Sequence, residues 1–151
     1  YHLTGLGDEA VRESRDRIAA ALQYSGFKFP IADITINLAP ADLPKEGGRY
    51  DLPIALALLV ASEQLDASRL NQYEFIGELA LTGALRGVPG AISSAMEAIK
   101  AGRQIIVAED NAAEVGLIEG HECLVAGHLQ EVCAFLEGRH ALTPSLPEED
   151  S

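Results

Sequence analysis

The chain has 151 residues, of which 48% are hydrophobic and 23% charged, so it can bury a core of its own without disulfides. Asp and Glu outnumber Lys and Arg by 23 to 11, which gives a net charge of −12. A chain with this charge repels phosphate backbones, so its net charge does not support sequence-independent binding to nucleic acid. No apolar run approaches the roughly 18 residues of a membrane-spanning helix, and the polar N-terminus does not resemble a signal peptide, so we expect a cytoplasmic protein without membrane contact.

The first half of the chain predicts a helix, a strand and a second, more buried helix. Over 8–25, apolar residues recur at helical spacing, acids occupy the first turn, and Gly26 follows as a stop signal. Residues 32–40, ADITINLAP, alternate apolar and polar side chains, which is typical of a half-buried strand. Asp51 is expected to cap a helix over 52–65, whose nearly continuous apolar character predicts burial on most sides.

The second half alternates strands and helices, which favours a layered α/β (α+β) architecture. The stretch 73–88, YEFIGELALTGALRGV, predicts two strands joined by a hairpin at Thr82-Gly83. Beyond it we expect a helix over 91–101, a strand over 104–108, a helix near 111–118, a strand over 122–126 and a last helix over 129–138. Residues 139–151 contain prolines and acids with little to bury, so we expect one domain over 1–138 followed by a linker or tail.

The two cysteines, Cys123 and Cys133, are too few for a disulfide framework and lie in apolar surroundings that predict buried thiols. His121 and His128 fall in the same span, which raises the question of a metal site. The paired ligand spacing of structural zinc sites is missing, and we therefore expect no metal there.

The loop 44–51, PKEGGRYD, places a lysine and paired glycines between a predicted strand and a predicted helix, where phosphate-binding loops and nucleophiles occur. It contains no Ser, Thr, Cys or His, and the G-x-x-x-x-G-K-[ST] pattern occurs nowhere in the chain, so we expect no ATP site of that class and no cofactor. Asp42, Glu46 and Asp51 could serve acid–base chemistry or bind a divalent cation. The alternative is a solvated loop whose Asp51 caps the next helix.

A Ser-Lys dyad is a second candidate for chemistry. Ser93 and Ser94 begin the predicted helix over 91–101, and Lys45 of the loop could activate one of their hydroxyls. Small residues at a helix start more often cap the helix or allow close packing, which is the alternative here.

Three stretches resemble one family: PADLPKEGGRYDLPIALALL, GELALTGALRGVPGAISSAMEAIKAG and IIVAEDNAAEV. With GLGDEAVRESRDRIAAAL and ITINLAPADL they extend the resemblance from Leu3 to about Gly138. The chain resembles the Lon-protease-like N-terminal domain of the ComM/YifB proteins, which are Mg-chelatase-like AAA+ proteins. This resemblance implies a ribosomal-protein-S5-domain-2-like fold, as in the Lon proteolytic domain, here without the first strands that family members carry.

In Lon the corresponding loop, Pro-Lys-Asp-Gly-Pro-Ser-Ala-Gly, holds the catalytic serine, and the catalytic lysine begins the later helix. By that resemblance the serine position falls on Arg49 and the lysine position on Ile92. Neither residue can attack a carbonyl or take a proton, so the resemblance implies a non-catalytic accessory or assembly domain. The alternative is a Lon-like peptidase with a rearranged dyad of Lys45 and Ser93 or Ser94.

The resemblance also implies partners. The family parent is a hexameric ring whose AAA+ module binds ATP and Mg and is linked to DNA branch migration in transformation and recombination. We expect Lys45, Arg49 and Arg86 to contact a neighbouring subunit, the AAA+ module or DNA, the alternative being exposed basic side chains without a partner. A third hypothesis, an assembly module for metal insertion, depends on the family label alone.

Overall fold

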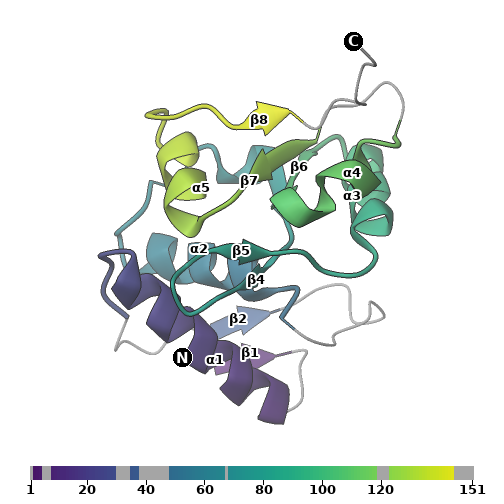
Figure 1. Ribbon diagram of the computed structural model, residues 1–151. Helices are drawn as coiled ribbons and strands as arrows, with labels where there is room; N and C mark the ends of the chain where they lie inside the picture. The colour runs from purple at the N-terminus through teal and green to yellow at the C-terminus, as the bar shows by residue number, and fades with distance from the viewer. Residues whose placement is uncertain are drawn as a thin grey trace.

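The computed structural model describes residues 2–4, 8–29, 35–37, 48–66, 68–118 and 123–144. Helices and strands are mixed, and a small, mostly parallel sheet with its helices lies above a layer that contains α1 and α2 (Figure 1). This confirms the predicted α/β class.

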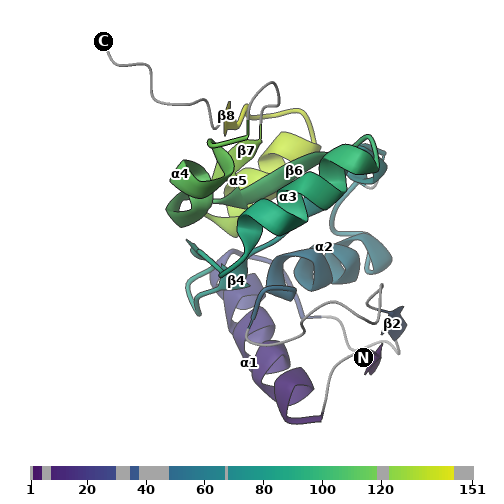
Figure 2. The same cartoon turned by 90° about the vertical axis from the view of Figure 1, so that its right-hand side faces the viewer.

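The main sheet has the strand order β3 (Tyr73–Phe75), β6 (Gln104–Ala108), β7 (Leu124–Ala126) and β8 (Thr143–Pro144). β6 runs parallel to both of its neighbours, and β8 pairs antiparallel with β7. Alternate residues of β6 enter two separate cores, because helices cover both faces of the sheet (Figure 2). Ile106 packs in the core formed with α1, α2 and α5, whereas Val107 packs in the core formed with α3 and α4.

Three helices match the predictions closely. α1 (Asp8–Tyr24) is followed by Gly26, whose φ of 89° lies in the left-handed region that favours glycine. α3 (Ala91–Lys100) and α5 (Leu129–Leu136) likewise precede glycines with positive φ. Local stop signals therefore placed these helix ends correctly.

α2 (Asp51–Ala61) is the buried central helix, as its apolar sequence predicts, although it ends before residue 65. Leu52, Leu58 and Leu59 are completely buried within it. In the same layer β1 (His2–Thr4) pairs in parallel with β2 (Thr35–Asn37), which occupies the centre of the predicted strand.

The prediction of two strands over 73–88 is wrong, because this stretch forms three. β3 joins the main sheet, and β4 (Glu78–Leu79) and β5 (Leu85–Arg86) form a separate hairpin. The chain leaves the main sheet at Gly77, whose N–H donates to the Arg49 carbonyl and whose carbonyl accepts from the Leu52 N–H. The predicted hairpin turn is confirmed, with Gly83 at a φ of 90°.

The C-terminal part differs from prediction in two places. The helix near 111–118 reduces to η2 (Glu109–Asn111) and α4 (Ala112–Val115). Leu142 is buried and β8 pairs with β7, so the expected linker from residue 139 begins with residues that pack against the sheet. The predicted boundary at 138 otherwise stays a prediction, because residues 145–151 lie outside the described part.

Cys123 and Cys133 are buried and neither is part of a disulfide, which confirms the predicted buried thiols. Burial raises the pKa of the Cys133 thiol to about 12. No three His, Cys, Asp or Glu side chains among the residues described could together hold a metal ion, and His121 lies outside them. In the same residues no helix has the length and apolar character needed to cross a membrane.

Candidate functional site

The described part of the predicted loop is a turn over 48–50 that leads into α2. Lys45, Asp42 and Glu46 lie outside the described residues. The Asp51 N–H donates to the Gly48 carbonyl at 2.8 Å. Two further backbone bonds of 3.1 Å join Arg49 and Leu52 to Gly77, so the end of the loop is fixed to the chain just before β4.

Asp51 does not cap α2, so that prediction is wrong. The N-cap residue is Tyr50, which makes no side-chain cap bond, and Asp51 is the first helical residue with a fully buried side chain. The Asp51 carboxylate lies between α1, α2 and β4. It accepts from Ser14 Oγ at 2.8 Å, from the Leu79 N–H at 3.1 Å, and from Arg17 Nε and Nη2 at 2.7 and 3.1 Å.

The electrostatics of Asp51 combine opposing effects. Burial raises the pKa of its carboxyl, and the hydrogen bonds from Arg17, Leu79 and Ser14 lower it, with burial the larger effect. The hydrogen bond with Asp51 raises the pKa of the Arg17 guanidinium. Ionising this carboxyl in the interior therefore carries a desolvation cost that its donors offset only in part.

Gly48, the second of the paired loop glycines, has no room for a side chain. A Cβ there would lie 2.5 Å from Glu78 Cγ and 2.7 Å from Asp51 Oδ2. The Gly48 N–H donates to Glu78 Oε2 at 3.2 Å, and Arg86 Nη1 lies 3.7 Å from the other oxygen of that carboxylate. The absence of a side chain at Gly48 therefore allows the loop end to pack closely against β4.

Arg49 connects the loop end to the first turn of α3. Its Nη2 atom donates to the Pro89 carbonyl at 3.1 Å and lies 3.4 Å from Ser94 Oγ. Ser93 is exposed beside it, and Ile92 is half-buried. The structure therefore brings two of the predicted site residues, Arg49 and Ser94, together.

The carboxyl ends of parallel strands are a usual place for ligands in α/β folds. Here the β4–β5 hairpin and the segment after it close that edge. Leu85 N–H donates to the Gly127 carbonyl at 3.0 Å, and the Asn111 side chain pairs with both the N–H and the carbonyl of Val88 at 2.9 Å. Sequence reasoning missed Asn111, whose one signal is a polar residue soon after a buried strand.

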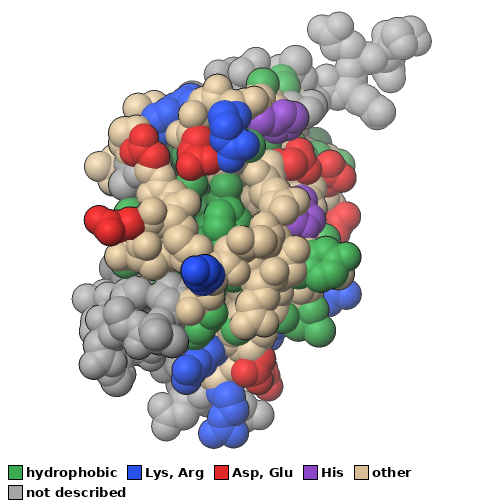
Figure 3. Space-filling model, turned by 90° about the vertical axis from the view of Figure 1, so that its left-hand side faces the viewer, with side chains coloured by type: hydrophobic (Ala, Val, Ile, Leu, Met, Phe, Trp, Pro, Cys, Tyr) green, Lys and Arg blue, Asp and Glu red, His purple; other side chains and the backbone are tan. Residues whose placement is uncertain are grey.

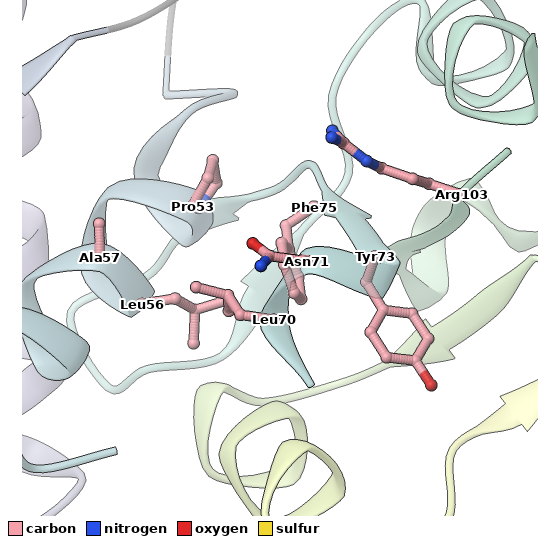
Figure 4. A pocket seen from close by; sticks show the side chains of 8 residues that line it. All are labelled: Pro53, Leu56, Ala57, Leu70, Asn71, Tyr73, Phe75 and Arg103. Atoms are coloured by element: carbon pink, nitrogen blue, oxygen red, sulfur yellow. The ribbon is translucent and has the colours of Figure 1, made fainter. Parts of the chain in front are cut away.

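A hollow of about 220 Å³ lies between α2 and β3 (Figure 4). Leu56, Leu70 and Phe75 give it an apolar lining, with Asn71 and Arg103 as its polar members. Arg103 pairs with Glu74 at 2.5 Å, so its charge is already matched. The hollow is smaller than typical small-molecule pockets of roughly 300–1,000 Å³.

On the face shown in Figure 3, the acidic and basic side chains of the described residues are interspersed and do not form a continuous patch of one charge. Of the expected basic contact residues, Arg49 is bonded within the domain as described above. The Arg86 side chain pairs loosely with Glu78 and stays 66% exposed. Arg86 is therefore the more accessible cation of the two.

Comparison with known proteins gives a consistent result. The model of the family "Subunit ChlI of Mg-chelatase" matches residues 1–111. YifB of Escherichia coli (strain K12) is 67% identical over 147 residues, which cover 97% of this chain and 29% of that protein. The competence protein ComM of Haemophilus influenzae is 51% identical over 142 residues, covering 94% of this chain and 28% of that protein.

A more distant relative, the protein Rv2897c of Mycobacterium tuberculosis, is 35% identical over 151 residues and is covered to 30% of its length. The chain thus spans less than a third of the length of these relatives. Together the family model and the two closer relatives show that the chain belongs to the ComM/YifB family of Mg-chelatase-like proteins.

Proposed function

We propose that this chain is a non-catalytic accessory or assembly domain of a ComM/YifB-type AAA+ protein, with an S5-domain-2-like fold of the kind found in Lon. Family membership and the α/β architecture support the proposal. So does the position of the loop end, which directly precedes a buried helix.

The contact between Arg49 and Ser94 carries the non-catalytic part of the proposal. A serine nucleophile needs a nearby group that can take its proton. A guanidinium has N–H donors and no acceptor, so Arg49 cannot serve as that base. Arg49 also donates a hydrogen bond to the Pro89 carbonyl, so its side chain connects the loop end to the start of α3.

The parent protein, in this proposal, is a cytoplasmic hexameric ATPase. ATP and Mg bind in an AAA+ module beyond this chain, and DNA is contacted by the full-length protein. This domain contacts its own AAA+ module and neighbouring subunits through Lys45, Arg49 and Arg86. Arg86 is the best placed of the described members, because most of its side chain is exposed.

Charge reversal in a full-length parent tests this role. We expect Arg86→Glu to lower the hexameric fraction in native mass spectrometry and to reduce ATP turnover, because it places a repelling charge at the contact. Arg12→Glu is the matched control, since Arg12 is an exposed arginine on α1 outside the proposed contact. Normal assembly and turnover in Arg86→Glu would contradict the proposed contact.

The competing proposal is a peptidase with a rearranged Ser-Lys dyad. It is favoured by one observation, namely that the end of the loop lies against the first turn of α3, where Ser94 Oγ is 3.4 Å from Arg49 Nη2. Lys45 of the same loop, which would have to activate that hydroxyl, lies outside the described residues. This proposal requires peptide cleavage that is lost in Lys45→Ala or in the Ser93→Ala/Ser94→Ala double variant.

A further inference from the structure

Four residues from three elements meet at one buried carboxylate, and we call them the Asp51 junction: Ser14 and Arg17 on α1, Asp51 at the start of α2, and Leu79 on β4. The Arg17 side chain is 22% exposed and the Asp51 side chain 1%. Both carboxylate oxygens accept two hydrogen bonds. The junction therefore joins elements that are far apart in the sequence through a buried carboxylate with four hydrogen-bond donors.

The two side chains at 49 and 51 reach different elements. Asp51 is bonded to α1, and Arg49 is bonded to Pro89 and Ser94 at the start of α3. The intervening backbone is a tight turn closed by the Asp51 N–H and the Gly48 carbonyl. Because the turn is short and hydrogen-bonded, a displacement of Asp51 displaces Arg49 as well.

The surroundings leave the turn little room for a gradual shift. Gly48 is so closely packed that a Cβ would lie within 3 Å of Glu78 and Asp51. The buried carboxylate also loses charge-assisted bonds as soon as it moves away from Arg17. Packed contacts of this kind favour discrete arrangements over continuous deformation.

We propose that the Asp51 junction is a positioning device through which α1 sets the place of the Arg49 guanidinium against α3. A shift of α1 would thereby move the loop end that precedes α2. The device depends on contacts within this chain and does not require that the proposed function be correct.

The test measures amide hydrogen exchange and the arginine side-chain resonances of the 151-residue chain by NMR. Arg17→Lys keeps the charge but removes the two-pronged geometry that the Asp51 carboxylate accepts. We expect exchange of the Gly77 N–H, which donates to the Arg49 carbonyl, to accelerate about tenfold more than exchange of the β6 amides. The Arg49 resonance should shift toward its position in Ser94→Ala, which removes the contact directly.

Arg12→Lys supplies the matched control, because it makes the same substitution at an exposed position of α1 and should leave both readouts unchanged. Equal acceleration at Gly77 and in β6 would show a global loss of stability and overturn the proposal. So would an unshifted Arg49 resonance.

If Arg17→Lys does not fold, Ser14→Ala decides the question, since it removes one neutral donor from the same carboxylate. A smaller shift of Arg49 in the same direction is expected for Ser14→Ala. No shift in that variant would equally overturn the proposal.

Discussion

Replacing Arg17 should lower the free energy of unfolding more than neutralising Asp51 does. In Arg17→Met, a carboxylate whose side chain is 1% exposed loses its only charged donor among the described residues. Breaking a buried pair in this way costs about 3–5 kcal/mol of the free energy of unfolding. Asp51→Asn removes the buried negative charge itself. The Arg17 guanidinium that remains can be hydrated, because its side chain is partly exposed.

For Asp51→Asn we therefore expect a loss of about 1–3 kcal/mol, mainly from weakened hydrogen bonds. The double variant Arg17→Met/Asp51→Asn should be more stable than Arg17→Met alone, because it removes the stranded charge. Urea denaturation followed by circular dichroism at pH 7 measures all three values, with Arg12→Met as an exposed control on the same helix.

The same pair predicts a pH effect whose sign follows from the pKa of Asp51. Burial raises this pKa in the folded protein, and loss of Arg17 removes groups that lower it, so the pKa rises further in Arg17→Met. A folded-state pKa above the unfolded value means that the folded protein binds the proton more tightly. Stability is then greatest below the unfolded pKa and is lost as the pH rises through the folded pKa.

Arg17→Met should therefore recover part of its lost stability, relative to the parent chain, as the pH is lowered from 7 toward about 4, the usual pKa range of an unfolded Asp. The reasoning is refuted if Asp51→Asn costs as much as Arg17→Met at pH 7. It is equally refuted if the difference in free energy of unfolding between Arg17→Met and the parent chain stays the same as the pH is lowered.

Three further predictions concern the neighbouring contacts. Gly48→Ala should lower the free energy of unfolding by about 1–3 kcal/mol in urea denaturation, because its Cβ would lie 2.5 Å from Glu78 Cγ, and an unchanged midpoint would contradict this packing. Asn111→Ala should cost about 2–3 kcal/mol by leaving the Val88 N–H and carbonyl without their partner, whereas Asp110→Ala at the exposed neighbour should cost far less. Because its pKa is about 12, the Cys133 thiol should react with a disulfide reagent at pH 8 only as fast as the chain unfolds, and rapid labelling of the folded chain would contradict its burial.

Local signals in the sequence sufficed for much of the fold. Helical periodicity and a following glycine located α1, α3 and α5, and the turn at Gly83 located the β4–β5 hairpin. The apolar run after the loop correctly predicted that α2 is the buried helix. These features depend on residues close together in the chain.

The errors arose where distant residues decide. An aspartate before an apolar run is typical of a helix cap, but Asp51 instead pairs with Arg17, 34 residues earlier. Similarly, nothing in the 73–88 stretch indicates that Gly77 bonds to Arg49 and Leu52, so one predicted strand became two. The sequence singled out Arg49 as a partner contact and Ser94 as part of an alternative dyad with Lys45, and only the folded structure shows the bond between Arg49 and Ser94.

Peptide cleavage is the most direct test of the non-catalytic assignment. The 151-residue chain and a full-length parent would be incubated with fluorogenic peptides and an unfolded protein, beside Lys45→Ala and Ser93→Ala/Ser94→Ala variants of each. We predict no turnover above that of the variants, because the described partner of Ser94 Oγ is the Arg49 guanidinium, which cannot accept a proton. Turnover that disappears in both variants would contradict the account and establish the rearranged dyad.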